Sequence, residues 1–232
     1  MESGSRQNVT FPSNGGEAHG YLAMPEGDAT GPGVVVIQEW WGLTDHMADV
    51  ADRLAAEGFV ALAPDLYGGR TTHDAGEAVS LMSELPVEQA VRDLAGAVDF
   101  LLAHERVTGG RVGAVGFCMG GGFVLQLGAE VGERAAAVVS FYGVFPHGEP
   151  DFSGLRAEVL GHFGERDGSA PPEAALALEQ KIREQSGTEV NFHFYDAGHA
   201  FYNDANPLGT YDPQAARLAW TRTREFLHSR LA

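Results

Sequence analysis

Short apolar runs rich in β-branched residues recur along the chain, separated by longer polar and amphipathic segments. The run at residues 33–37 is continuously apolar, which is typical of a strand buried on both faces of a parallel sheet. Comparable runs predict further strands at residues 59–62, 112–117, 136–141, 159–163 and 190–195. Before them, residues 9–12 and 20–24 flank the turn-forming segment 14–16 and predict an antiparallel hairpin at a sheet edge.

Apolar residues at helical spacing follow most of these strands. The clearest case is residues 87–104, where Val91, Leu94 and Val98 would share one face of a helix. Further helices are predicted near residues 44–57, 120–129, 172–185 and 213–231. Strands that alternate with helices favour right-handed crossovers and a mainly parallel sheet with helices on both faces, so we expect an α/β fold. Because the sequence has no repeat or long linker, residues 1–232 are expected to form a single domain.

Composition and charge narrow the classes of function. Hydrophobic residues make up 44% of the 232 residues and charged residues 20%, which is ordinary for a globular protein large enough to fold without disulfides or metals. The net charge of −17 disfavours binding to phosphate backbones or anionic lipids. The N-terminus lacks the features of a signal peptide, and no apolar run is long enough to span a membrane. We therefore expect a cytoplasmic monomer that acts on a small molecule, with no nucleic-acid or membrane partner.

The strand predicted at residues 112–117 runs into a glycine-rich turn, the sequence GFCMG at residues 116–120. This is the pattern of a nucleophile elbow, with Cys118 at the position of the nucleophile. A thiol at a helix N-terminus meets the positive end of the helix dipole, which favours the thiolate, and the Met119 N–H would be one oxyanion donor. One alternative is a buried cysteine without a chemical role. Another is a phosphate-binding loop, which is less consistent because the segment lacks the lysine of a P-loop and follows a late strand.

A nucleophilic thiol needs a base, and the base needs a carboxylate to orient it. In the chain order of an α/β-hydrolase, the acid follows a later strand and the histidine comes near the end. Asp167 follows the strand at 159–163 and His199 follows the strand at 190–195, so both would lie on loops at strand ends. Glu165 and Asp196 are competing carboxylates nearby. The other histidines are expected to be packed within strands, at His162 and His193, or solvated on the surface and in loops, at His19, His46, His73, His104, His147 and His228.

The loop after the first buried strand, residues 38–42, has the sequence QEWWG. In an α/β-hydrolase this loop supplies the second oxyanion donor, expected here to be the N–H of Trp40. A carboxylate and two indoles at the end of a buried strand indicate a role in the site, so Glu39 is a further candidate. The alternative is that the tryptophans cover the edge of the core while Glu39 is solvated.

Taken in order, these motifs resemble those of the dienelactone hydrolases, also called carboxymethylenebutenolidases. The resemblance runs from about residue 20 to residue 227 and rests on QEWWG at 38–42, PDLY at 64–67, GFCMGG at 116–121 and GHAF at 198–201. It implies an α/β-hydrolase fold, no cofactor or metal, and lactone hydrolysis through a thiol acyl-enzyme. It further implies that Cys118 is the nucleophile, His199 the base and Asp167 the orienting acid. In the same family Glu39 would contact the resting thiol and help to produce the thiolate when substrate binds.

The sequence departs from the dienelactone-specific members at two places. Those members resemble one another in an arginine four residues after the catalytic histidine, which holds the substrate carboxylate; here that residue is Asn203. The segment expected to supply a second such arginine, residues 71–86, contains none, and Arg70 is the nearest. The prediction is therefore a cysteine-dependent hydrolase of a small ester or lactone, without commitment to dienelactone itself.

The remaining candidate residues would bind the substrate; they are Trp41, Tyr142, Phe201 and Asn203. Two other interpretations stay open. The same triad would also serve a thioesterase, a promiscuous carboxylesterase or a peptide-cleaving relative, because a fold does not fix a substrate. A non-catalytic ligand-binding or redox-sensing protein would instead use Cys118 as an oxidisable thiol, although a full set of nucleophile, base, acid and oxyanion loop argues against that interpretation.

Overall fold

The computed structural model describes residues 6–13 and 15–231, whose strands form one sheet in the order β1-β2-β4-β3-β5-β6-β7-β8. The strands are β1 (Val9–Ser13), β2 (Gly16–Ala23), β3 (Gly31–Ile37), β4 (Val60–Pro64), β5 (Val107–Phe117), β6 (Ala135–Phe141), β7 (Glu158–Gly164) and β8 (Val190–Tyr195). Strands β3 to β8 run parallel to one another, whereas β1 and β2 pair antiparallel and β2 runs antiparallel to β4. The predicted α/β fold and edge hairpin are thereby confirmed; Asn14, in the expected turn, lies outside the described residues.

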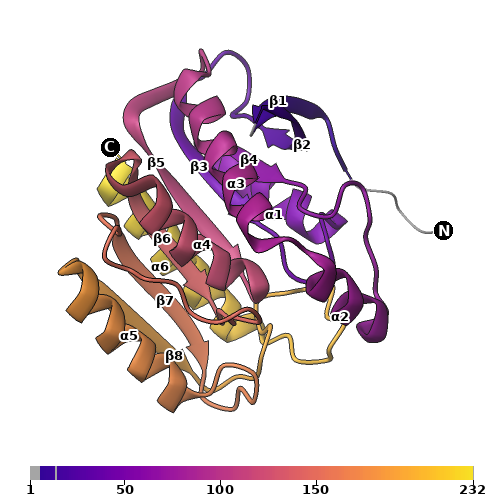
Figure 1. Ribbon diagram of the computed structural model, residues 1–232, viewed down its shortest axis with the longest axis vertical. Helices are drawn as coiled ribbons and strands as arrows, with labels where there is room; N and C mark the ends of the chain where they lie inside the picture. Colours follow the sequence, from indigo (N-terminus) through magenta and orange to yellow (C-terminus); the bar gives the residue numbers. More distant parts are fainter. Residues whose placement is uncertain (1–5, 14, 232) are drawn as a thin grey trace.

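Helices cover both faces of this sheet. They are α1 (Asp45–Ala56), α2 (Ala75–Glu84), α3 (Val87–Ala103), α4 (Met119–Val131), α5 (Pro172–Ser186) and α6 (Pro213–Leu231), with a short 3₁₀ turn at Gly132–Arg134. Figure 1 shows α3, α4 and α5 over one face, and the apolar core on that face is shared with strand residues such as Val35 and Ile37. Helices α1 and α6 pack with Val34 and Val36 on the opposite face, as the alternation of side chains along a strand requires.

One helix, α2, lies in residues 71–86, for which no element was predicted from the sequence. Its N-cap is Asp74, whose side chain accepts a hydrogen bond of 2.8 Å from the N–H of Glu77. The Glu77 carboxylate in turn accepts a hydrogen bond from the Thr72 hydroxyl at 2.6 Å. The spacing Asp-x-x-Glu is that of a capping box, and it was the sequence signal that could have predicted this helix.

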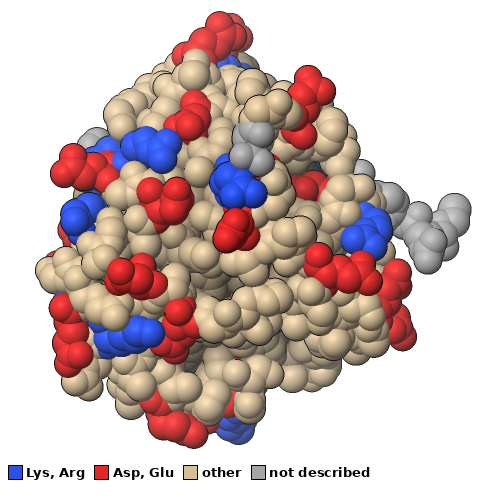
Figure 2. All heavy atoms as spheres, viewed as in Figure 1, with Lys and Arg blue, Asp and Glu red and all other residues tan. Residues whose placement is uncertain are grey.

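The negative charge of the protein is distributed over its surface. In Figure 2 acidic side chains are spread over the visible face, and basic side chains lie beside acidic ones. Arg53 pairs with Asp49, and Arg183 with Glu179, each one helical turn apart. None of the helices within the described part of the chain is both long and apolar enough to cross a membrane. A surface with this excess of carboxylates disfavours anionic partners through its long-range field.

Candidate active site

The turn between β5 and α4 places Cys118 at the carboxyl edge of the sheet. Cys118 has φ 53°, a left-handed conformation that non-glycine residues rarely adopt and that is found at strained functional turns. The flanking glycines allow the tight approach of strand and helix. A Cβ on Gly116 would lie 1.9 Å from the carbonyl oxygen of Gly120, and a Cβ on Gly120 would lie 2.4 Å from that of Ile37. The glycine spacing of the motif is therefore required by the backbone geometry of the elbow.

Gly116→Ala is expected to destabilise the protein by about 3 kcal/mol or more, because the new methyl group meets a backbone oxygen that has no rotamer to change. Urea unfolding measures this effect. Gly110→Ala on the same strand is the matched control, because its Cβ would meet nothing within 4 Å. The control should shift stability by less than about 0.5 kcal/mol. Equal effects of the two substitutions would contradict the role given to Gly116.

Cys118, His199 and Asp167 lie in one hydrogen-bonded chain. The Cys118 Sγ is 3.3 Å from His199 Nε2, and His199 Nδ1 is 2.8 Å from Asp167 Oδ2. Asp167 is only 3% exposed, and its other oxygen accepts hydrogen bonds from the N–H groups of Ser169 and Ala170, at 2.7 and 2.9 Å. These hydrogen bonds hold the Asp167 carboxylate in a fixed orientation toward the His199 imidazole. They come from the loops after β5, β7 and β8, which meet because parallel strands end at one edge.

The competing carboxylates lie elsewhere. Glu165 is exposed, and Asp196 is exposed and forms an ion pair with Arg166. The structure thus brings the imidazole of His199 to Asp167 and leaves its acidic neighbours in solvent.

The electrostatics of this trio favour a charged imidazole. Burial lowers the pKa of His199, but the hydrogen bonds and charges of Asp167 and Cys118 outweigh it and raise the pKa to about 10. Burial raises the pKa of Asp167, yet the His199 contact and the two backbone N–H groups lower it overall. An imidazolium beside the sulfur is the partner that a thiolate requires.

Glu39 lies buried near this trio, with 2% of its surface exposed. Its Oε2 accepts a 2.5 Å hydrogen bond from Asn203 Nδ2, and its Oε1 accepts one of 3.2 Å from the Tyr142 hydroxyl. Burial raises the pKa of Glu39, while attraction to His46 and the bonds from Asn203 and Tyr142 oppose that rise. Because the hydrogen-bond partner described for the Cys118 thiol is His199, contact between Glu39 and the resting thiol stays a prediction.

The two candidate oxyanion donors lie at the start of α4 and in the loop after β3. Met119 is the first residue of α4, where a helix leaves its N–H groups without intrahelical partners. Trp40 lies in the loop after β3, which is closed by a hydrogen bond from the Gly42 N–H to the Glu39 carbonyl. Use of these N–H groups as an oxyanion hole stays a prediction.

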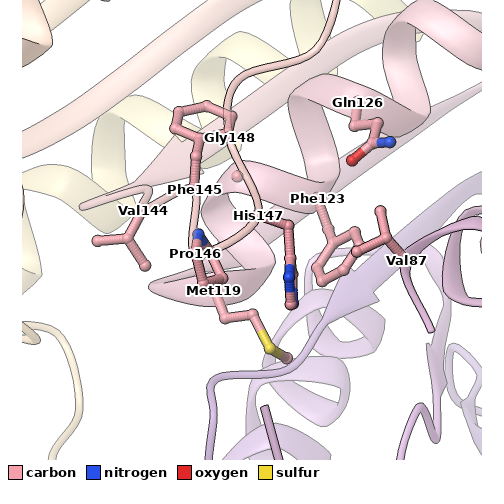
Figure 3. A pocket seen from close by; sticks show the side chains of 10 residues that line it. Val87, Met119, Phe123, Gln126, Val144, Phe145, Pro146, His147 and Gly148 are labelled. Atoms are coloured by element: carbon pink, nitrogen blue, oxygen red, sulfur yellow. The ribbon is translucent and has the colours of Figure 1, made fainter. Parts of the chain in front are cut away.

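A cavity of about 520 Å³ opens onto Cys118. It is lined by Trp40, Met82, Cys118, Val144, Phe145, Pro146, Ser169, His199 and Leu208. Val144, Phe145 and Pro146 also line a second pocket, of about 20 Å³, whose lining includes Met119 (Figure 3). The loop after β6 and Trp40 thus both contribute to the lining of the cavity at Cys118.

The four residues expected to bind substrate are not among the described lining residues of this cavity, so a role for them in substrate binding stays a prediction. Trp41, Tyr142, Phe201 and Asn203 are each at most 3% exposed. Tyr142 and Asn203 hold Glu39, the Phe201 ring packs 5.4 Å from that of Tyr142, and the Trp41 ring lies 4.7 Å from that of Trp40. All four are buried and contact Glu39, Tyr142 or Trp40. Tyr142 and Phe201 belong to the apolar core on the α1 and α6 face of the sheet.

Several lining residues were not foreseen. Val144–Pro146 could have been found, because these residues directly follow a strand end at the catalytic edge. Met82 comes from α2, and Leu208 from the long loop after β8; neither carries a local sequence signal. Their presence depends on how distant segments pack.

One histidine was placed wrongly by the sequence. His46 was expected in solvent, but its side chain is 2% exposed and its Nδ1 lies 2.9 Å from Asp204 Oδ1. The reason is that His46 lies in the first turn of α1, on the face that packs against the sheet. His162 is packed as expected, with its ring nitrogens 2.8 Å from the Tyr195 hydroxyl and 3.0 Å from that of Thr223.

Comparison with known proteins places the chain in a family. The model of the dienelactone hydrolase family matches residues 18–231. Protein usf of Aquifex pyrophilus is 32% identical, over 95% of this chain and 96% of its own length. A protein of Aquifex aeolicus named "Putative carboxymethylenebutenolidase" is 30% identical, over 97% of this chain and 99% of its own length.

Solved structures agree. P91, a dienelactone hydrolase-like promiscuous phosphotriesterase from metagenomic libraries, has a TM-score of 0.82 and 29% identity, covering 98% of each chain. The crystal structure named "Putative Dienelactone Hydrolase" from Klebsiella pneumoniae has a TM-score of 0.84 and 27% identity, covering 97% of each chain. The α/β-hydrolase fold and the resemblance seen in the motifs are confirmed. This chain belongs to the dienelactone hydrolase family and is a hydrolase of ester or lactone bonds.

Proposed function

We propose that this protein hydrolyses a small, uncharged ester or lactone through a thiol acyl-enzyme on Cys118. His199 serves as base and acid, and Asp167 orients it. The observation that carries the proposal is the unbroken chain from Sγ to Nε2 at 3.3 Å and from Nδ1 to Oδ2 at 2.8 Å, at the mouth of a cavity. A nucleophile, a base within reach and an orienting acid are the parts that covalent acyl transfer needs.

In the first half of the reaction the thiol gives its proton to Glu39, the His199 imidazolium pairs with the resulting thiolate, and the sulfur attacks the carbonyl carbon. The N–H groups of Met119 and Trp40 stabilise the oxyanion, each contributing roughly 3 kcal/mol. The imidazolium of His199 then donates its proton to the departing alkoxide, leaving a thioester on Cys118.

In the second half His199 takes a proton from water, and the resulting hydroxide attacks the thioester carbonyl. The carbon–sulfur bond breaks, the acid leaves, and the proton held by Glu39 returns to the sulfur and restores the thiol. Asp167 keeps Nδ1 protonated throughout, so that Nε2 faces the reacting atoms.

The cavity favours an uncharged substrate. Apart from His199, none of its described lining residues carries a formal charge. At the position of the family arginine stands Asn203, which is buried on Glu39 and does not reach the cavity. Arg70 pairs with Glu84 on the surface instead of lining the cavity. A carboxylate in the substrate would therefore be desolvated without a partner.

A matched substrate pair tests this proposal. p-Nitrophenyl butyrate and p-nitrophenyl hemisuccinate share a leaving group and an acyl length, but only the second carries a carboxylate. The neutral ester is expected to have at least about tenfold higher kcat/KM, corresponding to about 1.4 kcal/mol. Dienelactone, which is anionic, should also be a poor substrate. Equal or faster turnover of the hemisuccinate would show that the site binds an anion and would overturn this part of the proposal.

A further inference from the structure

A further cavity lies beside the one that opens onto Cys118. Its volume is about 360 Å³, and both cavities have Val144, Phe145 and Ser169 in their linings. Val144 and Phe145 belong to the loop after β6, and Ser169 belongs to the loop after β7. We call this space the side cavity; it begins at the edge of the cavity at Cys118.

The shared edge is attached to the residues that hold His199. The N–H of Ser169 donates to Asp167 Oδ1 at 2.7 Å, and the N–H of Ala170, which lines the side cavity, donates to the same oxygen at 2.9 Å. The other oxygen of Asp167 lies 2.8 Å from His199 Nδ1. The same hydrogen bonds therefore hold both the imidazole and the rim of the side cavity.

The lining of the side cavity is mostly apolar. Among its described lining residues only Glu149 and Ser169 have polar side chains. The Glu149 carboxylate lies 2.8 Å from Lys181 Nζ, so its charge is paired. The residues that line the side cavity but not the cavity at Cys118 include Phe163, Ala170, Ala174, Ala175 and Leu178. Such a lining suits a hydrocarbon group, which gains by leaving water.

The start of α5, which borders the side cavity, is poor in donors for an anion. Ala174 and Ala175 lie near the start of this helix, where N–H groups often remain free. Here both N–H groups donate to the carbonyl oxygen of Pro171 at 3.0 Å, and neither Pro171 nor Pro172 has an N–H. None of these four residues therefore supplies a free N–H to a phosphate or carboxylate, as a helix N-terminus otherwise does.

We propose that the side cavity is a subsite for an apolar chain of the substrate, so that the enzyme prefers neutral esters with a medium-length alkyl chain. The inference rests on the proposed function, because it places the ester carbonyl at Cys118. From there the chain passes Val144 and Phe145 and lies against Ala174 and Leu178. Each methylene group buried in this way favours binding by about fourfold, so kcat/KM should rise with chain length.

Ala174→Phe tests the subsite. Ala174 lines the side cavity and is exposed, so a phenyl ring there occupies the space without replacing a core residue. Ala177→Phe is the matched control, because Ala177 is exposed on the same helix but is not among the described lining residues of either cavity. Ala174→Leu, with a smaller side chain than phenylalanine, provides a graded third variant.

Two ratios of kcat/KM are measured, at concentrations below the solubility limit of each ester. The first compares p-nitrophenyl octanoate with p-nitrophenyl acetate and tests the acyl chain; the second compares octyl acetate with methyl acetate and tests the alcohol chain. In wild type at least one ratio should exceed about ten, and Ala174→Phe should lower that ratio by about tenfold. Ala174→Leu should lower it less, and Ala177→Phe should leave it unchanged. The ratio that responds identifies which chain enters the subsite.

Two results would overturn the subsite. One is a wild-type enzyme without preference for the longer chain in either series. The other is a preference that Ala174→Phe retains in full, which would place the chain in the cavity at Cys118 alone. A loss of folded enzyme cancels in each ratio, and the thermal unfolding midpoint checks it independently. The proposed function fails separately, if Cys118→Ala keeps wild-type turnover of the short esters.

Discussion

Cys118→Ala is expected to lower kcat for p-nitrophenyl butyrate by about 10⁴-fold or more, because the remaining groups can only assist attack by water. The thermal unfolding midpoint should change little, because alanine at an 8% exposed position removes one sulfur atom and leaves the elbow backbone in place. Initial rates of p-nitrophenol release from p-nitrophenyl butyrate by wild type and variant measure the loss of kcat.

Chemical modification of wild-type Cys118 provides the control for that variant. Cys118 is the one cysteine in the sequence, so alkylation of wild type with iodoacetamide modifies the same atom that the substitution removes. The alkylated protein should lose activity in proportion to the label bound. Alkylated protein or a folded Cys118→Ala variant within tenfold of the untreated wild-type rate would contradict the assignment of the nucleophile.

Asp167→Asn is expected to lower kcat by about 10⁴-fold while KM stays nearly constant. In this variant the side-chain carbonyl oxygen can still accept the two backbone N–H groups that now bind Asp167, but the new amide group would face Nδ1 of His199 as a donor. The imidazole would then carry its proton on Nε2, toward the sulfur, and could not act as a base. Glu165→Gln is the matched control, since this carboxylate is close in sequence but exposed.

The same variant has a signature in the pH dependence of stability. The pKa of Asp167 is lowered in the folded protein, so its stabilisation is present above the pKa of the unfolded chain and is lost as the pH falls through the folded value. Asp167→Asn should remove this part of the acid destabilisation, and Glu165→Gln should retain it. Urea midpoints measured between about pH 3 and 7 test this. Identical curves for Asp167→Asn and wild type would contradict the interaction with His199.

The elements that sequence predicted well are those set by local rules. The strand run ending at Phe117, the glycines around Cys118 and the helix that follows all obey short-range steric and periodic constraints. Chain order then placed Asp167 and His199 on later strand ends, and the structure brings all three side chains together. Parallel topology explains why, since it places all these ends on one edge of the sheet.

The features that sequence missed depend on tertiary packing. Asn203 was expected to bind the substrate, and no sequence pattern indicated that it would be buried and donate a hydrogen bond to Glu39. His46 reads as an ordinary polar residue at a helix start until the loop after His199 folds over it and supplies Asp204. The cavity wall combines Met82 and Leu208, which are far apart in the chain. No pattern within either segment indicates that they meet.

The most direct test of the proposed mechanism is intact-mass spectrometry. The protein is quenched with acid during turnover of p-nitrophenyl acetate, and its mass is compared with that of the untreated protein. The account predicts that a fraction of wild type gains one acetyl group, mapped to the peptide containing Cys118, and that Cys118→Ala gains none. His199→Ala, mixed with excess ester, should retain whatever label it acquires for longer, because deacylation lacks its base. Sustained turnover by wild type with no acetylated protein, or equal labelling of Cys118→Ala, would contradict an acyl-enzyme on Cys118.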